Sequence, residues 1–591
     1  MTLDAPAGAR GRFGQAVARA WASAPARAEA GWAVLSAALL ALAFPDFGLW
    51  ALAWVGLVPL LFVVAARPRA PQAFALGWLT GTLFFYASCH WLTFPMIHYA
   101  GIPAFVAYPL LFPATLVAGL FPALFALALA RLCARWGPLA LFLAPPLWAA
   151  SEWARLGVIG QLWNALGYSQ AEAPELIQAA RAGGVYAVSF LLLLSNAALA
   201  YALLRRSLRA AALSLGALSC VALAVAYFLL SAAPAVSDPG TPGAVVVAVQ
   251  PNVMPDFERP AAEFRALEEE HFRMSADVLR ALDEGVVPPA LVEEAERREA
   301  DGGGDFEAGG ARGVNGVFVH GLLRPELSKL PRVVVWPESP MNFSFADDAR
   351  FREKLAGFNR EHRSSLIFNS MEPVSGGGDY NAAVLVNEEG GLAVQYDKIR
   401  LLPFGEYVPL PRWVPGASFV RGVVGDFTPG ARYTLMPLGG ADGPRAGVFI
   451  CVESAYPSLT RQFAREGADV LIEMTNDAYQ GDTAVLRQHL ANAAFRAVET
   501  GRPVLRVTNT GITARVTARG HVLDATEKFR PAVRVWTAAR SDGGQTFYVR
   551  HGDAFVMLCA AASAFAVLLT FNWSRLRSAV RALSSPRGAR P

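Results

Sequence analysis

Long apolar stretches constrain the fold of this chain more than any other feature of its sequence. Of its 591 residues, 54% are hydrophobic and only 17% are charged, a balance too apolar for a wholly soluble protein. A transmembrane helix needs about 20 apolar residues, so the sequence predicts a polytopic α-helical membrane bundle of about eight spans, the first and fifth of which are short. The apolar stretches cover residues 32–44, 49–66, 73–91, 104–130, 138–150, 183–204, 210–230 and 554–571.

The arginines predict the orientation of this bundle, because positively charged loops stay on the cytoplasmic side. Arginines precede the first stretch and follow the second, fourth, sixth and eighth, whereas residues 93–103, after the third stretch, contain none. Both termini are therefore predicted inside and residues 232–552 outside, with Arg155 and Arg181 as the exceptions. The arginines behind this prediction are Arg10, Arg12, Arg19, Arg27, Arg67, Arg69, Arg131, Arg135, Arg205, Arg206, Arg209, Arg575, Arg577 and Arg581.

The polar segment between the seventh and eighth stretches has the pattern of an α/β domain. After a turn-rich linker at residues 237–243, short β-like runs alternate with helical ones, which is typical of a layered α/β fold. Residues 283–330 contain acidic runs and three consecutive glycines, which predicts a flexible insertion. Strands are expected at residues 244–249, 333–336, 365–369, 382–386, 447–450, 470–473, 504–508 and 513–517, and helices at 261–282, 348–360, 458–466 and 484–500.

Composition and motifs argue against several functional classes. A net charge of +4 on a chain of this length gives no case for nucleic-acid binding. The five cysteines form neither a disulfide framework nor a zinc pattern. The sequence contains no nucleotide-binding or metalloprotease motif. We therefore expect no metal, no cofactor and no nucleic-acid partner.

Cys451 is the one cysteine in the polar segment, and it directly follows the predicted strand at residues 447–450. A strand end holds a side chain rigidly and offers it at the edge of a sheet, which suits a nucleophile. A lone buried cysteine is nevertheless more often a small core residue, so the assignment depends on its partners. The other cysteines, all in apolar stretches, are Cys89, Cys133, Cys220 and Cys559.

Two further segments place charged residues in apolar surroundings. Glu338 follows closely after the predicted strand at residues 333–336, and Lys398 and Glu406 lie in the segment 396–409. Taken singly, a strand-end glutamate is usually solvated and a lone lysine usually lies on the surface. Lysine is scarce in this chain, however, so composition does not explain Lys398. The lysines are Lys329, Lys354, Lys398 and Lys528.

Together these segments resemble the Glu–Lys–Cys triad of the nitrilase superfamily, and the whole chain resembles one membrane branch of it, the apolipoprotein N-acyltransferase family. The likeness excludes only the first 30 residues, the 283–330 insertion and the tail. Val452 stands where that family usually has an aromatic residue and Tyr479 where it usually has tryptophan, so these differences concern the positioning of the acyl chain. The motifs are Trp-Pro-Glu-Ser at 336–339, Pro-Phe-Gly-Glu-Tyr-Val-Pro at 403–409, Asn-Asp-Ala at 476–478, Ser-Glu-Trp-Ala-Arg at 151–155 and Trp-Asn-Ala-Leu-Gly-Tyr-Ser-Gln at 163–170.

The resemblance implies an αββα nitrilase-like sandwich domain and a role for each site residue. Cys451 would be the nucleophile, Glu338 the general base, and Lys398 the cation that holds the thiolate and the oxyanion. Glu406 and Glu453 would keep Lys398 charged and oriented. Four residues would bind substrate: Trp163, Tyr168, Asn476 and Tyr479. For Trp163 and Tyr168 the alternative is that they are simple interface anchors.

The resemblance also implies a reaction and a location. The acyl chain of a membrane phospholipid would pass through a Cys451 thioester to the N-terminal amine of a diacylglyceryl-cysteine apolipoprotein, the last step of lipoprotein maturation. The enzyme would lie in the bacterial inner membrane with its catalytic domain on the periplasmic side. The expected division is a basic lead at 1–30, a membrane block at 31–231, the catalytic domain at 232–552, a final helix at 553–573 and a basic tail at 574–591.

Two alternatives remain open from the sequence. A membrane-tethered nitrilase-type amidase acting on a small amide could use the same triad, but one span would suffice to tether it. A transporter or receptor whose outer domain only binds ligands would favour charged residues within the spans, and the predicted spans have almost none.

Overall fold

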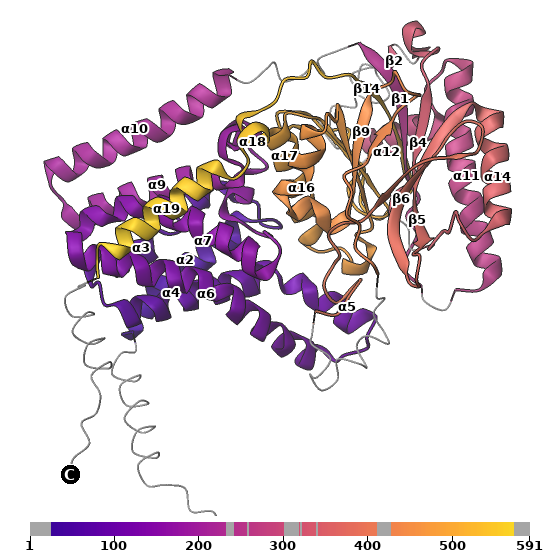
Figure 1. Cartoon of the computed structure of the whole chain (residues 1–591). Coiled ribbons are helices and arrows are strands. Elements are labelled where there is room, and N and C mark those ends of the chain that lie inside the picture. The colour runs from indigo at the N-terminus through magenta and orange to yellow at the C-terminus, as the bar shows by residue number, and fades with distance from the viewer. Residues whose placement is uncertain are drawn as a thin grey trace, which may run out of the picture.

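A computed structural model describes residues 25–231, 241–256, 259–300, 318–319, 322–338, 341–409 and 427–571. It has two parts, a helical block and an α/β domain, which lie side by side (Figure 1). The basic residues predicted before the first span lie mostly outside the described residues, as do the tail and the glycine-rich centre of the 283–330 segment.

The helical block contains the apolar stretches, each of which is mainly helical, as predicted. Three segments among the described residues are long and apolar enough to cross a membrane: Ala104–Ile159, Val185–Arg205 and Leu208–Ser231. The helices are α2 (Arg27–Ala43), α3 (Val58–Ala66), α4 (Ala70–Ser88), α5 (Thr93–His98), α6 (Ala104–Trp136), α7 (Ala144–Ile159), α8 (Ala180–Gly183), α9 (Val185–Arg205), α10 (Leu208–Ser231) and the C-terminal α19 (Ala554–Leu568).

The predicted number of about eight spans is not confirmed. An α-helix rises about 1.5 Å per residue and the hydrocarbon core is about 30 Å thick. The apolar segments Trp50–Ala66 and Ala554–Leu568 are therefore short for a crossing. By contrast, α10 exposes a run of leucines along its length, and Figure 1 shows it at the outer edge of the block. Such a surface requires an apolar surrounding, as a lipid-facing helix has.

The α/β domain is built on two six-stranded sheets, with strand orders β14-β1-β4-β5-β6-β7 and β13-β12-β11-β10-β9-β8. In the first sheet β1, β4 and β5 run parallel, and in the second β9, β10 and β11 do. The strands are β1 (Pro242–Gln250), β4 (Arg332–Val335), β5 (Ser364–Pro373), β6 (Asp379–Val386), β7 (Leu392–Asp397), β8 (Leu435–Pro437), β9 (Arg445–Ile450), β10 (Val470–Thr475), β11 (Val504–Thr508), β12 (Ala514–Val516), β13 (Val522–Leu523) and β14 (Ala532–Ala539).

Alternate residues of the central strands pack into two different cores, because successive side chains of a strand point to opposite faces. Val246 and Val335 join the core between the sheets. Val245 and Val334 join the core under the outer helices. These helices are α11 (Ala261–Glu284) and α14 (Ala349–His362), while α16 (Pro457–Arg465) and α17 (Val485–Thr500) cover the second sheet. The predicted αββα sandwich is confirmed.

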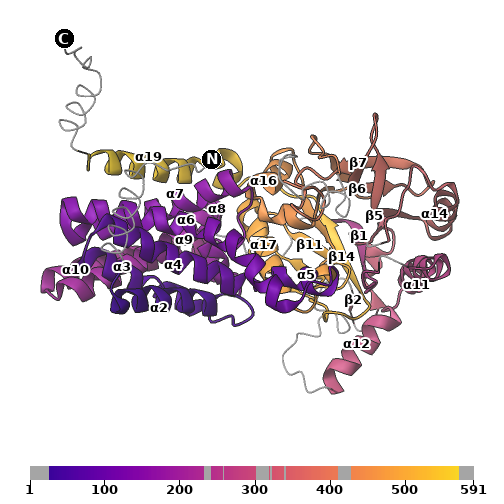
Figure 2. The same ribbon diagram turned by 90° about the horizontal axis from the view of Figure 1, so that it is seen from below.

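Part of the segment predicted as a flexible insertion is packed. Helix α12 (Pro289–Ala300) lies against β14, and Figure 2 shows it projecting from the lower edge of the domain. Glu294 of this helix accepts two hydrogen bonds from the guanidinium of Arg534, at 2.6 and 2.7 Å. Leu291 is buried beside it. Helical structure is therefore present within the segment whose charged sequence predicted a flexible insertion.

Candidate active site

The three residues predicted as a triad lie together where strands of the two sheets end. Glu338 follows β4, Lys398 directly follows β7, and Cys451 directly follows β9. The Nζ atom of Lys398 lies 3.2 Å from Oε1 of Glu338. Both charges act on the thiol of Cys451. The structure thus assembles the predicted residues from three separate strand ends.

Lys398 is enclosed by acceptors and is only 1% exposed. Its Nζ donates to Oε1 of Glu406 at 2.8 Å as well as to Glu338. Burial lowers the pKa of Lys398, but the charges of Glu338 and Glu406 outweigh it and hold that pKa well above the ordinary value. Lys398 is therefore an ammonium donor at neutral pH and cannot serve as a base.

Asn381, on β6, joins the two carboxylates that flank this lysine. Its Nδ2 donates to Oε1 of Glu338 at 3.1 Å and to Oε1 of Glu406 at 2.5 Å. The backbone N–H of Asn476 donates to Oε2 of Glu338 at 3.1 Å, and that of Leu402 donates to Oε2 of Glu406 at 2.6 Å. Both carboxylates are thereby held as oriented acceptors on either side of Lys398.

Cys451 occupies a sharp turn at the end of β9. Its φ of 53° lies in the left-handed region, which is uncommon for any residue but glycine. Burial and the charge of Glu338 raise the pKa of its thiol well above the ordinary value, although Lys398 lowers it. The thiol therefore stays protonated at rest and needs a base when it attacks.

Glu453 connects the end of β7 to the end of β9. Its carboxylate accepts hydrogen bonds from the Tyr396 hydroxyl at 2.8 and 2.9 Å, and from the backbone N–H groups of Ile399 at 2.8 Å, Arg400 at 3.0 Å and Ile450 at 2.8 Å. Burial raises its pKa to about 7, against the lowering effect of these N–H donors. Glu453 thus holds the backbone on both sides of the site, whereas Glu406 contacts the Lys398 ammonium itself.

Trp163 and Tyr168 lie in the contact between the helical block and the domain. The Nε1 of Trp163 donates to Oε1 of Gln488 at 2.9 Å. The hydroxyl of Tyr168 accepts from Nη2 of Arg496 at 3.2 Å. Gln488 and Arg496 are both on α17, and both rings are at most 9% exposed. The two rings therefore join the two parts of the protein.

Asn476 and Tyr479 lie beside Glu338, where the helical block reaches the site. The ring of Tyr479 lies 5.9 Å from that of Tyr99, just after α5, and the Tyr99 hydroxyl donates to the carbonyl of Ala478 at 3.2 Å. Burial and the charge of Glu338 raise the pKa of Tyr479 to about 12. These contacts place both residues beside the predicted general base, at the contact with the helical block.

Sequence reasoning missed Asn381 and the pair Gln488 and His489. Asn381 directly precedes an apolar run and belongs to no recognisable motif. It lies near Lys398 because strand β6 pairs with strand β7, which the local sequence does not reveal. Gln488 and His489 are adjacent polar residues in a helix whose other residues are largely apolar, and this is a signal that could have been used.

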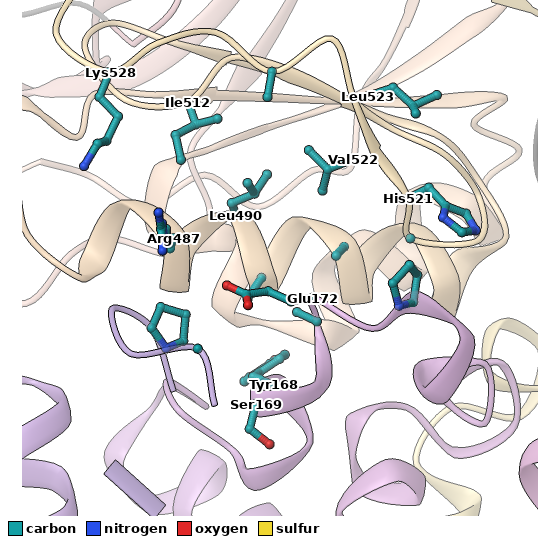
Figure 3. A pocket seen from close by; sticks show the side chains of 18 of the residues that line it. Tyr168, Ser169, Glu172, Arg487, Leu490, Ile512, His521, Val522, Leu523 and Lys528 are labelled. Atoms are coloured by element: carbon teal, nitrogen blue, oxygen red, sulfur yellow. The ribbon is translucent and has the colours of Figure 1, made fainter. Parts of the chain in front are cut away.

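A cavity of about 970 Å³ lies between the helical block and α17, on a different face of that helix from His489. Figure 3 shows Tyr168 and Glu172 of the block facing Arg487 and Leu490 of α17 across it. Among the described residues that line it there is no predicted catalytic residue. This cavity is therefore separate from the triad.

Comparison with known proteins agrees with the division into a helical block and an α/β domain. The family model "Carbon-nitrogen hydrolase" matches residues 330–537, so the α/β domain is of the nitrilase class. The model "Apolipoprotein N-acyltransferase N-terminal domain" matches residues 36–198 of the helical block. The chain therefore combines a nitrilase-class enzyme domain with a membrane domain.

The relatives identify the family. An apolipoprotein N-acyltransferase of Geobacter metallireducens is 30% identical over 549 residues, which is 91% of this chain and 95% of the relative. One of Allorhizobium ampelinum is 30% identical over 522 residues, with 83% and 87% covered. This chain belongs to the apolipoprotein N-acyltransferase family. Among solved structures, an amidase from Nesterenkonia sp. AN1 aligns with a TM-score of 0.32 at 15% identity, over 54% of this chain and 97% of the amidase.

Proposed function

We propose that this protein transfers an acyl chain from a membrane phospholipid, through a thioester on Cys451, to the N-terminal amine of a diacylglyceryl-cysteine apolipoprotein. Membership of the family supports lipoprotein N-acylation. The observation that carries the mechanism is the Lys398 ammonium, held between Glu338 and Glu406 and acting on the Cys451 thiol.

The first half-reaction forms the thioester. Glu338 accepts the thiol proton of Cys451 while Sγ attacks the ester carbonyl carbon of the phospholipid. The C–S bond forms, and the negative charge that develops on the carbonyl oxygen is stabilised by the N–H groups of Lys398. When the carbonyl re-forms, the ester C–O bond breaks. Glu338 then returns its proton to the leaving glycerol oxygen, which releases a lysophospholipid.

The second half-reaction transfers the acyl chain to the acceptor. The neutral α-amine of the apolipoprotein attacks the thioester carbon, the C–N bond forms, and Lys398 again stabilises the oxyanion. The C–S bond then breaks. Glu338 takes the proton that the amine loses and passes it to the thiolate, so the amide product leaves and Cys451 is again a thiol.

The membrane block has a clear part in this proposal, because both substrates are anchored in lipid. Helix α10 immediately precedes the domain and α19 follows it. We place the block at residues 31–231, the catalytic domain at 232–552 on the periplasmic side of the bacterial inner membrane, and the final helix at 553–573, with both termini in the cytoplasm. The distribution of arginines supports this orientation.

The test is to incubate the purified full-length protein with labelled phospholipid and no apolipoprotein. The enzyme should stall with an added acyl mass that hydroxylamine removes and that maps to Cys451. Cys451→Ala should fold normally and form no adduct, because the lost thiol leaves at most a small cavity. An adduct that persists in Cys451→Ala would place the nucleophile elsewhere. Release of ammonia from a small amide without an acyl adduct would instead support the amidase alternative.

A further inference from the structure

Four ionisable side chains form a buried cluster behind Cys451, and the acyl-transfer mechanism uses none of them. Glu473 lies on β10, Asp477 just after it, Arg506 on β11 and His489 on α17. All four are at most 3% exposed. Arg506 pairs with Glu473 at 2.7 Å and with Asp477 at 2.6 Å. Burying a carboxylate is costly unless it is paired, so two carboxylates with one arginine call for a second cation.

His489 supplies that cation. Its Nδ1 lies 2.8 Å from Oδ1 of Asp477, and its Nε2 lies 3.0 Å from Oε1 of Glu473 and 3.0 Å from the carbonyl oxygen of Cys451. All three facing atoms are acceptors, so both ring nitrogens must donate and the ring is an imidazolium. Burial and Arg506 lower the pKa of His489, but Asp477 and Glu473 outweigh them and raise it to about 9.

The carbonyl that this imidazolium contacts belongs to a strained residue. Cys451 has φ of 53°, and a non-glycine residue keeps this unfavourable backbone conformation only when its surroundings hold it there. On the preceding side, the N–H of Ile450 donates to Glu453 at 2.8 Å. On the other side, Nε2–H of His489 donates to the Cys451 carbonyl. The nucleophile is thus held at the backbone from both directions.

The helix that carries His489 is itself fixed to the membrane block through the neighbouring residue. Oε1 of Gln488 accepts hydrogen bonds from Nε1 of Trp91 at 3.1 Å and from Nε1 of Trp163 at 2.9 Å. Its Nε2 donates to the carbonyls of Pro45 at 3.1 Å and Ser88 at 2.9 Å. Three segments of the block, at residues 45, 88–91 and 163, therefore set the position of α17, and with it the position of His489.

We propose that His489 is a positioning residue for the nucleophile: it donates Nε2–H to the carbonyl of Cys451 and holds the turn that presents the thiol to Glu338 and Lys398. Through Gln488, the same helix ties this turn to the membrane block that delivers the lipid. This role rests on the proposed acyl transfer at Cys451 and adds a residue that contacts no reacting atom.

Two matched substitutions separate positioning from a merely structural role. In His489→Gln the amide nitrogen reaches the place of Nε2 and keeps the donor to Cys451, whereas in His489→Asn it stands near Nδ1 and keeps only the donor to Asp477. We expect thioester formation to slow about 100-fold in His489→Asn, since a misplacement of about 1 Å can cost that much, and markedly less in His489→Gln. The lipid KM should stay unchanged in both. The exposed His551→Asn is the control.

A second readout does not depend on the lipid reaction. Iodoacetamide alkylation of Cys451 can be measured on the Cys451 peptide by mass spectrometry. Its rate should be highest in wild type, lower in His489→Gln and lowest in His489→Asn. If wild type forms no thioester but this order holds, acyl transfer is refuted while the positioning role stands. Equal rates in the two variants, or wild-type rates in a folded His489→Asn, would refute positioning.

If His489→Asn does not fold, the pH dependence of wild type decides. The measured quantity is the rate of Cys451 alkylation in wild type divided by the rate in His489→Gln. This ratio should fall as pH rises through about 9, where the imidazolium loses its proton. The facing groups are Asp477, Glu473, Arg506 and the Cys451 carbonyl. A ratio that stays constant from pH 7 to 10 would overturn the proposal.

Discussion

Replacing Lys398 by arginine tests whether the site uses one placed donor or only positive charge. The lysine is 1% exposed, and its Nζ lies 2.8 Å from Glu406 and 3.2 Å from Glu338. Asn381 already fills the space between these carboxylates, at 2.5 and 3.1 Å from them. A planar guanidinium with five donors cannot take the place of this compact ammonium.

The expected loss follows from these distances. An arginine would pair with Glu338 and Glu406 side by side, which turns its donors away from the oxyanion. Removal of one oxyanion donor costs about 10²–10³-fold in rate, or about 2.7–4 kcal/mol. The extra volume in a filled site should separately lower the free energy of unfolding by about 1–3 kcal/mol. Lys398→Arg should therefore be nearly inactive while it still folds.

The assay is the initial rate of thioester formation, read as hydroxylamine-sensitive acyl mass on the intact protein. Thermal unfolding of the same samples shows how much of any loss reflects stability. Lys329→Arg is the matched control, because that side chain is exposed and its exchange should change neither rate nor stability. A rate for Lys398→Arg within a factor of about two of wild type would refute the reasoning, since the position would then supply only bulk charge.

Three further predictions address stability and topology. Glu453→Gln turns an amide N–H₂ toward groups that are themselves hydrogen-bond donors. It should therefore lower the free energy of unfolding, measured by denaturant titration, by about 1–3 kcal/mol. The control Glu389→Gln, at an exposed position, should leave the free energy of unfolding unchanged. The pKa of His489 rises from 6.5 to about 9 on folding. Protonation of His489 therefore contributes about 3 kcal/mol to the free energy of unfolding below pH 6.5, and this contribution is lost as pH rises through 9. The free energies of unfolding of wild type and His489→Gln should converge at high pH, and parallel pH profiles would contradict this. Reporter fusions after Arg206 and after Gly243 should report opposite sides of the membrane, and the same side for both would remove the proposed orientation.

The fold was largely predictable because its signals are local. Apolar stretches located the helices of the block, and the alternation of short β-like and helical runs predicted the α/β layers. The strands β7, β8, β13 and β14 were missed, as they lie at or next to the edges of the two sheets and their residues lack a continuous apolar run. The prediction of about eight spans is not confirmed, because an apolar stretch shows that residues avoid water and not whether a helix is long enough to cross a bilayer.

The chemically unusual residues could be found from their local sequence alone: a cysteine at a strand end, a rare lysine in an apolar segment, and glutamates beside them. How these residues act depends on contacts that form only in the folded chain. Asn381 reaches Glu338 and Glu406 because β6 pairs with β7. His489 reaches the Cys451 carbonyl because α17 packs between the second sheet and the membrane block. Hydrogen bonds and charges act over a few ångströms of space, and the packing of sheets and helices, not separation along the chain, sets those distances.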